Sequence, residues 1–545
     1  MFQKNLIYLI IAIMILGCVP PSTTQTPDLV PTEALATNWW KDAVFYEIFV
    51  RSFYDSDGNG IGDFNGITAK LDYLNDGDPT TNTDLGITGI WLMPIFPSPS
   101  YHGYDVTDYY SINPQYGTME DFKHLVEEAH KRGIHIVIDM VINHTSDKHP
   151  WFKDAKSDVN SPYRDWYIWS ETDPNYKGPW NEDVWHPSLT GYYYGIFESF
   201  MPDLNYNNPE VTAEMEKVYS FWLKDVGVDG FRLDAAKHLI EENQLQQNTA
   251  STHRWYQKMY PVYKEMNPSA MTVGELFGDS MSVASKYVKN NEFDLVFNFQ
   301  LATTIIKAAQ TGRGKNVSRV IETSNAFLTE YQYAPFLTNH DQNRVMGEFQ
   351  NDVNKAKVAA AMLLTAAGTP FIYYGEEIGM GGSKPDENIR RPMQWDNTAN
   401  AGFTTGKPWR SPDANFTDIN VSSQTKDPDS LLSNYRELIH LREIHPVLQT
   451  GQYIAVDCNN PAVYSALRVD EKEIVLVLIN LDKETITNYE LDAANTILLD
   501  KTYNADVLLG SGQAQGLSVT NSGFSNYTPV DELPAYSTTI IKIQP

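Results

Sequence analysis

Cysteine is almost absent from this chain, whose 545 residues include only Cys18 and Cys458. Two cysteines cannot form the set of disulfides that stabilises small secreted domains, so that class of protein is excluded. A chain of this length can instead bury a large hydrophobic core, and 42% of its residues are apolar. We therefore expect a globular protein of two or three domains.

Basic residues are also scarce, since 41 Lys and Arg stand against 69 Asp and Glu and give a formal net charge of −28. A surface this acidic repels phosphate backbones, so we expect no nucleic-acid partner. Trp and Tyr, in contrast, are plentiful, with 12 and 32 residues. Most of them are expected to pack in the interior, but this composition also suits surfaces that stack on sugar rings.

Long hydrophobic runs are limited to one short segment near the start of the chain. Lys4 precedes the apolar run Leu6–Gly17, which has the charged start and short apolar core of a secretory signal. The run is too short to span a bilayer. We therefore expect residues 1–17 to be a signal peptide and the protein to be exported.

The end of that run, Ile15–Cys18 (ILGC), resembles a bacterial lipobox. The resemblance implies cleavage before Cys18 and lipidation of its thiol, which would make the protein a cell-envelope lipoprotein at the outer membrane or cell surface. The alternative is an ordinary signal peptide beside a chance cysteine. Residues 18–37 are rich in Pro and Thr and lack a packing pattern, so we expect them to form a tether.

Strand-like and helix-like segments alternate from residue 38 onward. The segment Met119–Arg132 has a helix's spacing, with Phe122 and Leu125 on one face and Gly133 as its stop. Eight runs are expected to be strands, at residues 44–50, 87–94, 134–144, 228–234, 271–275, 293–299, 334–341 and 370–374. Eight strands with intervening helices predict an α/β fold, a (β/α)8 TIM barrel formed by residues 38–143 and 206–445.

Two further regions interrupt or follow this alternation. Residues 144–205 are aromatic and rich in Pro and Asp, without helical periodicity, and are too long for a simple connection. They predict a small domain inserted after the third strand. Residues 446–545 change to alternating strands with turns rich in Asn, Asp and Gly, which predicts a C-terminal antiparallel β-sandwich.

Carboxylates follow three of the expected barrel strands, at Asp234, Glu275 and Asp341. Strand ends in a parallel barrel gather on one face, so these side chains can meet although they are far apart in sequence. Two carboxylates suffice for glycoside hydrolysis with retention, and a third can hold sugar hydroxyls. A single Asp at a strand end is more often structural, but three of them with Arg232 and two histidines are difficult to explain by packing.

At this point the sequence resembles the α-amylase family of glycoside hydrolases, over about residues 38–545. The segments that look like its signature regions, in order along the chain, are Asp139–His144 (DMVINH), Met201–Asn205 (MPDLN), Gly230–His238 (GFRLDAAKH), Gly274–Glu275 (GE) and Phe336–Asp341 (FLTNHD). The resemblance implies that Asp234 is the nucleophile, Glu275 the acid/base and Asp341 the transition-state stabiliser.

The same resemblance implies the other substrate contacts. Arg232 would hold the nucleophile ionised, because a neighbouring cation favours a charged carboxylate. His144 and His340 would bind hydroxyls of the ring being cleaved, and Tyr104 would stack on it. Lys237 and His238 would lie on the leaving-group side.

These features favour an endo-acting α-1,4-glucan hydrolase that degrades starch or maltooligosaccharides. Tyr101 and His102 stand where chain-end enzymes tend to carry an acidic residue, which indicates an open cleft. The segments Arg391–Trp395 (RPMQW) and Met201–Asn205 favour instead an α-glucosidase or neopullulanase-like enzyme on short maltooligosaccharides. A non-catalytic glycan-binding protein on the same scaffold is a further alternative. The sequence does not indicate an oligomeric state.

The loop Asp55–Asp63 (DSDGNGIGD) has oxygen side chains at alternate positions with glycines between them, a pattern by which a short loop binds a hard cation. It begins like an EF-hand but has Gly66 where that motif has its bidentate Glu; the alternative is a solvated turn rich in Asp and Asn. Relatives bind calcium with such a loop, which implies a site formed by Asp55, Asp57, Asn59, Asp63 and the carbonyl of Ile61. Many relatives hold a second ion near Asn143.

Overall fold

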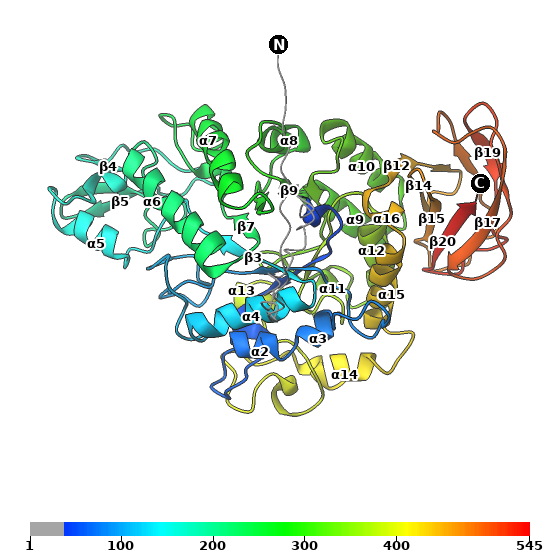
Figure 1. Ribbon diagram of the computed structural model, residues 1–545, viewed down its shortest axis with the longest axis horizontal. Coiled ribbons are helices and arrows are strands. Elements are labelled where there is room, and N and C mark those ends of the chain that lie inside the picture. Colours follow the sequence, from blue (N-terminus) through cyan, green and yellow to red (C-terminus); the bar gives the residue numbers. More distant parts are fainter. Residues whose placement is uncertain (1–37, 545) are drawn as a thin grey trace, which may run out of the picture. The chain divides into compact units, whose positions relative to one another are not determined.

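The computed structural model describes residues 38–544 (Figure 1). The predicted signal peptide at residues 1–17, the lipidation site at Cys18 and the tether up to residue 37 lie outside the described residues. Residues from Asn38 to the C-terminus form one compact unit. Among the described helices, none combines the length and the apolarity needed to cross a membrane.

Eight parallel strands form the central sheet, in the spatial order β10-β9-β8-β7-β3-β2-β1-β11. Their bounds are β1 Phe45–Ile48, β2 Gly89–Leu92, β3 His135–Met140, β7 Gly230–Leu233, β8 Met271–Gly274, β9 Leu295–Phe297, β10 Tyr333–Ala334 and β11 Phe371–Tyr373. A parallel bridge between Phe336 and Phe371 joins the two edges, so the sheet is nearly closed into a barrel. The predicted TIM barrel is confirmed.

The two faces of these strands pack into different parts of the core. Phe45, Trp91, Val137 and Val273 belong to one buried cluster inside the barrel. Their neighbours along the strands, such as Ile90, pack instead against the surrounding helices. Successive residues of a strand point to opposite faces, and both faces of this sheet are covered, which explains why the strands are apolar throughout.

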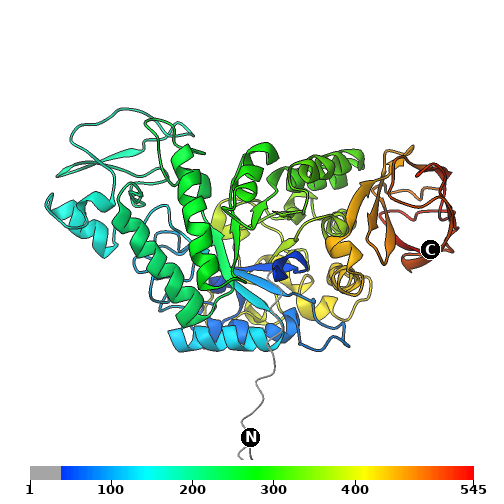
Figure 2. The ribbon, with the colours of Figure 1, turned by 45° about the horizontal axis from the view of Figure 1, so that its top comes forward.

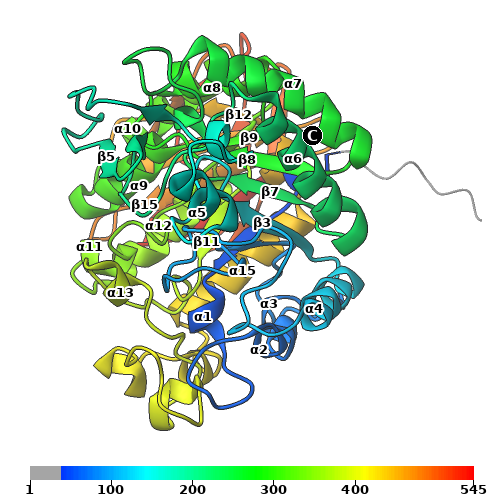
Figure 3. The ribbon, with the colours of Figure 1, turned by 90° about the vertical axis from the view of Figure 1, so that its left-hand side faces the viewer.

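The longer helices surround the barrel strands (Figure 2), and Figure 3 shows α6, α7 and α8 outside β7 and β8. These longer helices are α4 Met119–Lys131, α6 Pro209–Ser220, α7 Ala250–Met266, α8 Met281–Lys289, α9 Phe299–Thr311, α10 Lys315–Phe327, α12 Val353–Thr365 and α15 Leu431–Ile444, whereas α5 Pro150–Ser157 lies in the segment 144–205. Thr118 and Asp121 begin α4 with a reciprocal capping box. Helix α4 also agrees with the segment predicted from sequence.

Residues 144–205 carry their own small antiparallel sheet, in the order β4-β6-β5, together with α5. The strands are β4 Trp169–Ser170, β5 Trp185–Ser188 and β6 Gly191–Tyr194. A bridge between His144 and Asp203 joins the beginning and the end of this segment beside β3. The insertion therefore leaves and rejoins the barrel at one place, next to the carboxyl end of the third strand.

The C-terminal part contains two antiparallel sheets (orange and red in Figure 1). Six strands form the larger sheet, in the order β12-β14-β15-β20-β17-β18, and three form the smaller, β13-β16-β19. Their bounds are β12 Gln452–Ala455, β13 Asp457–Cys458, β14 Val463–Val469, β15 Ile474–Asn480, β16 Leu491–Ala493, β17 Thr502–Leu509, β18 Leu517–Ser518, β19 Phe524–Tyr527 and β20 Thr538–Gln544. Leu467 and Leu476 of the larger sheet share one core with Leu491 and Phe524 of the smaller, as expected of a β-sandwich.

The first described residues lie at the amino ends of the barrel strands. Trp39 belongs to the short helix η1 Trp39–Lys41, which directly precedes β1. Its indole nitrogen donates to the carbonyl of Ser269, just before β8, at 2.9 Å. Its ring stacks on His135, the first residue of β3, with 3.7 Å between the ring centres. The chain therefore enters the barrel at its amino-terminal rim.

Candidate active site

A cavity of about 580 Å³ lies at the carboxyl ends of the barrel strands. Asp234 follows β7, Glu275 follows β8 and Asp341 lies beyond β10, and all three line the cavity. The predicted contact residues Tyr104, His144, Lys237 and His238 line it as well, together with Trp180, Phe277, Asp386 and Arg390. The structure therefore brings the three predicted carboxylates to one place, at the rim opposite to Trp39.

Arg232 lies beneath the cavity, fully buried, and contacts three carboxylates. Its Nη1 donates to Asp139 at 2.9 Å and to Asp234 at 2.7 Å, and its Nη2 donates to Glu275 at 2.6 Å. A buried guanidinium is costly unless its charge is compensated, and here the compensation comes from the carboxylates themselves. Arg232 therefore fixes Asp234 and Glu275 relative to each other.

The protonation state of Glu275 differs from that of an ordinary glutamate. Burial raises its pKa to about 7, against the opposing effect of Arg232, and the negative charges of Asp234 and Asp341 raise it further. A carboxyl group that still holds its proton near neutral pH can give it to a leaving group. Glu275 is the carboxyl of the site that is suited to be a general acid.

Asp341, in contrast to Glu275, is held in its ionised form. Burial disfavours its charged form, but His340 and then Arg390 outweigh burial and hold the pKa of Asp341 well below its usual range. The Nε2 of His340 is 3.1 Å from one carboxylate oxygen, and Nη2 of Arg390 is 2.8 Å from the other. Asp341 is therefore a fixed negative charge in the cavity.

Tyr104 and His144 form the floor beside these groups. The hydroxyl of Tyr104 donates to Asp139 at 2.9 Å and lies 2.6 Å from Nε2 of His340. The ring of Tyr104 is nearly parallel to that of His340, with 5.6 Å between their centres. Nε2 of His144 lies 3.1 Å from the carbonyl oxygen of Tyr104, and burial lowers the pKa of His144.

Lys237 and His238 lie beyond Glu275, at one end of the cavity. Nζ of Lys237 donates to the carbonyl of Phe277 at 2.6 Å, and the ring of His238 packs against Trp180 with 5.4 Å between ring centres. The side chains of Trp180 and Phe277 are about half exposed, at 54% and 55%. This end of the cavity therefore presents two large aromatic surfaces to solvent.

Residues 47–451 of this chain match the family model for the alpha-amylase catalytic domain. The chain belongs to the α-amylase family. Alpha-amylase 3 of Dictyoglomus thermophilum is 40% identical over 485 residues, covering 87% of this chain and 92% of that protein. An oligo-1,6-glucosidase of Parageobacillus thermoglucosidasius is 34% identical over 549 residues, covering 84% and 96%. The crystal structure of alpha-amylase from H. orenii matches with a TM-score of 0.80 and 44% identity, covering 92% of this chain and all of that one.

These relationships confirm the resemblance found in the sequence and the assignment to the glycoside hydrolases. They do not decide the substrate, because the relatives include both an alpha-amylase and oligo-1,6-glucosidases. The form of the cavity bears on the choice between internal and terminal cleavage.

Several residues of this α-amylase family site were not identified from the sequence. Glu47 is the third of the four residues of β1 and lies in the middle of the strand expected at residues 44–50, so the strand-end argument did not include it. Asp139 was part of a recognised segment but received no role. Arg390 and Trp180 lie on long loops, and no local pattern shows that these loops reach the cavity.

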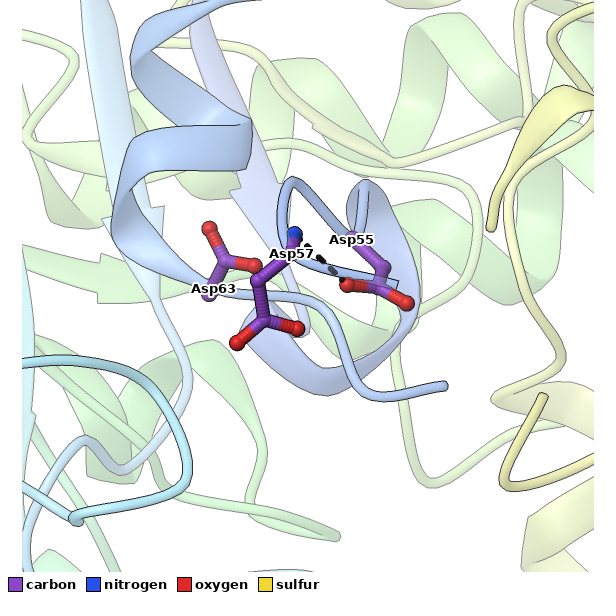
Figure 4. Close-up of side chains that lie close together, drawn as sticks. All are labelled: Asp55, Asp57 and Asp63. Carbon is purple, nitrogen blue, oxygen red and sulfur yellow. Dashed lines mark hydrogen bonds between the residues drawn. The ribbon is translucent and has the colours of Figure 1, made fainter. Parts of the chain in front are cut away.

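The predicted calcium loop gathers three carboxylates (Figure 4). Asp55, Asp57 and Asp63 each place one oxygen within 4.8 Å of the others, with Asp55 and Asp63 buried. Burial raises the pKa of Asp63, and the charge of Asp55 adds to this effect. The side-chain oxygen of Asn59 accepts from the backbone nitrogen of Ile61 at 2.8 Å. A partly buried set of oxygen donors fits a hard cation such as calcium.

A second group of buried oxygens lies near Asn143. Its side-chain nitrogen donates to Asp203 at 3.1 Å. Burial raises the pKa of Asp203 to about 8 and holds that of the neighbouring Glu241 well above its usual range. Among the described residues, Oδ1 of Asn143 and Oε1 of Glu241 have no hydrogen-bond partner. The second ion that the family resemblance implies near Asn143 would find these unpartnered oxygens within a buried group.

Proposed function

We propose that this protein is an endo-acting α-1,4-glucan hydrolase that degrades starch or maltooligosaccharides with retention of configuration. The observation that carries the mechanism is the double contact of Arg232 with Asp234 and Glu275. Retention needs two carboxyl groups roughly 5 Å apart, and a single guanidinium that touches both supports such a separation.

In this mechanism Asp234 attacks the anomeric carbon while Glu275 gives its proton to the departing glycosidic oxygen. A covalent glycosyl-enzyme forms and the first product leaves. Glu275, now ionised, takes a proton from water, whose oxygen attacks the anomeric carbon and releases Asp234. Asp341 stays ionised throughout and stabilises the positive charge that develops on the sugar ring.

The proton on Glu275 predicts the alkaline side of the pH profile. Because its pKa is about 7, kcat/KM should fall about tenfold per pH unit above that value. The measurement is kcat/KM on a maltooligosaccharide from pH 5 to 9. An aryl maltoside whose leaving group needs no proton should retain its glycosylation rate over the same range, and a profile that stays level to pH 9 on both substrates would contradict the role of Glu275.

Internal cleavage is supported by the two ends of the cavity. Trp180 packs against His238 and Lys237 donates to Phe277, two residues after Glu275, whereas Arg390 contacts Asp341 and Asp386. We expect the first group on the leaving-group side and the second group on the other side. A neutral sugar chain gains affinity by stacking on exposed aromatic rings, so Trp180 offers a surface for glucose units past the scissile bond. In this arrangement a glucan chain would have contacts on both sides of the scissile bond, which supports internal cleavage.

We expect a maltoheptaoside blocked at its non-reducing end to be cleaved to short oligosaccharides. Trp180→Ala should lower kcat/KM on this substrate about 5- to 30-fold, the loss of one stacked ring, with little effect on maltotriose. Leu189→Ala is the matched control, since Leu189 is fully exposed in the same insertion. If the blocked substrate stays uncleaved while unblocked chains release glucose, the α-glucosidase alternative is favoured. Cleavage of pullulan would favour the neopullulanase-like alternative.

We also propose that calcium binds the loop Asp55–Asp63 and stabilises the barrel without taking part in the chemistry. Calcium added to chelator-treated protein should raise the melting temperature by several degrees, since a ligand at a hundredfold excess over Kd adds about 2.7 kcal/mol. Asp57→Ala should abolish the shift, whereas Asp78→Ala, in another Asp-rich turn, should keep it. If calcium does not shift the melting temperature of the wild type, calcium binding at this loop is contradicted.

Lipid anchoring at Cys18 and display at the outer membrane or cell surface remain part of the proposal. Their support is the ILGC sequence at Ile15–Cys18 and the Pro- and Thr-rich stretch that follows. Labelling with a palmitate analogue should require Cys18, while Cys458→Ser, the matched control, should leave it unchanged. Equal labelling of Cys18→Ser and wild type would exclude the anchor.

A further inference from the structure

Glu47 is a buried carboxylate near the carboxyl end of β1, and it takes no part in the proposed mechanism. It is 2% exposed, and its Oε1 lies 2.5 Å from Nδ1 of His340. His340 is itself fully buried, and its other ring nitrogen faces Tyr104 and Asp341. The imidazole of His340 therefore lies between Glu47 and the predicted transition-state stabiliser.

The hydrogen-bond partners of the two ring nitrogens determine the charge of His340. The single hydroxyl proton of Tyr104 is donated to Asp139, so the oxygen of Tyr104 can only accept from Nε2 of His340. Asp341 lies 3.1 Å from the same nitrogen and is ionised, so it accepts as well. On the other side, Nδ1 faces a carboxylate of Glu47. Both ring nitrogens thus face acceptors, and both must carry a proton.

We propose that Glu47 is a positioning residue: its carboxylate holds His340 as an imidazolium, which in turn keeps Asp341 ionised and directed at the sugar ring. Glu47 does not touch the substrate cavity and acts only through His340. The inference depends on the hydrolase reaction of the proposed function but not on whether cleavage is internal.

The other charged or titratable groups around His340 are of both signs, and the cations Arg232 and Arg390 among them disfavour an imidazolium. The groups are Tyr104, Asp139, Arg232, Glu275, Asp341 and Arg390, while Tyr373 pairs with Glu47 on the neighbouring strand β11. Burial alone would lower the pKa of His340, but Asp341 and Glu47 outweigh it and raise this pKa to about 10. Arg390 donates to the carbonyl of His340, not to its ring, at 2.9 Å.

Glu47→Gln separates the charge of Glu47 from its shape. The glutamine oxygen can still accept from Nδ1, but the negative charge that favours the imidazolium is lost. When His340 becomes neutral, Nε2 presents a lone pair to the oxygens of Asp341 and Tyr104, which repel it. The variant is therefore expected to be impaired only at a pH where His340 has lost its proton.

The first test needs no substrate. NMR of protein labelled at its 12 histidines, with His340→Gln to assign the signal, should show His340 as an imidazolium from pH 6 to 9. In Glu47→Gln the same signal should titrate at about pH 6 to 7, a shift of about three units, because the charge that favours the imidazolium is lost. A wild-type His340 that titrates between pH 6 and 8 would overturn the proposal, whatever the substrate proves to be.

The second test is the ratio of kcat between Glu47→Gln and wild type, on any maltooligosaccharide that the wild type cleaves. We expect the variant to be close to wild type at pH 5.5 and about 10- to 100-fold slower at pH 8. In the His340→Gln background, Glu47→Gln should add no further loss. A deficit that is the same at every pH, or one that adds to that of His340→Gln, would mean a structural role only and overturn the inference.

Discussion

Replacing Asp234 by Asn is expected to lower kcat on soluble starch by at least about 10⁴-fold. The asparagine oxygen can still accept the bond that Arg232 donates at 2.7 Å, so the cavity should keep its shape and its affinity for glucan. Only the nucleophile is lost, because a neutral amide does not attack the anomeric carbon. The measurement is reducing-sugar release, with maltooligosaccharide binding by calorimetry as the second readout.

Asp229→Asn is the matched control for this experiment. Asp229 lies just before β7, at the opposite end of the strand that Asp234 follows, and accepts bonds from His130 and from the backbone of Ile136. It should change stability but leave kcat within a few-fold of wild type. Equal rates for Asp234→Asn and wild type would leave the protein with a binding role and no part for Asp234 in catalysis.

Arg232→Met should have the largest effect on stability. The substitution leaves Asp139 fully buried and Glu275 and Asp234 beside it without their shared countercharge. Removing one partner of a buried ion pair costs about 3–5 kcal/mol in the free energy of unfolding. We also expect kcat to fall by at least about 100-fold, since the two reacting carboxyls lose the group that fixes them.

The loss of unfolding free energy in Arg232→Met should be larger at high pH than at low pH. In the wild type, burial raises the pKa of Asp139 to about 6 although Arg232 opposes it, so without Arg232 this pKa rises further. A carboxyl group whose pKa is higher in the folded than in the unfolded state contributes stability at low pH. This contribution is lost as the pH rises through the folded-state pKa. Urea unfolding should therefore show a smaller deficit at pH 5 than at pH 8. Arg254→Met, at an exposed arginine, should show no deficit at either pH, and an equal loss for Arg232→Met at both would contradict this explanation.

The barrel and the carboxylates were predictable because both depend on short-range patterns. Apolar runs of four to six residues mark strands that are buried on both faces, and the residue after such a run must lie at the carboxyl rim. This rule placed Asp234, Glu275 and Asp341 together although more than a hundred residues separate the first from the last. The nine-residue loop Asp55–Asp63 was predictable for a similar reason, since its donors are neighbours in sequence.

The remaining parts of the site depend on contacts that no local pattern records. Arg390 reaches Asp341 from a loop beyond β11, and Trp180 reaches His238 from the insertion. Their positions follow from how long loops cross the rim, which is decided by packing across the whole domain. Glu47 differs from these two, because it lies inside β1, where the sequence shows a lone carboxylate in an apolar run but does not show its partner, His340.

The stacking of Trp39 on His135 has a consequence for access to polymeric substrate. It fixes the point where the upstream chain joins the barrel at the rim opposite to Asp234 and Glu275. A linker attached at that rim, whether to a lipid or to a bead, should leave the opening of the cavity accessible to substrate. Immobilisation through the N-terminus should accordingly preserve turnover of insoluble starch grains.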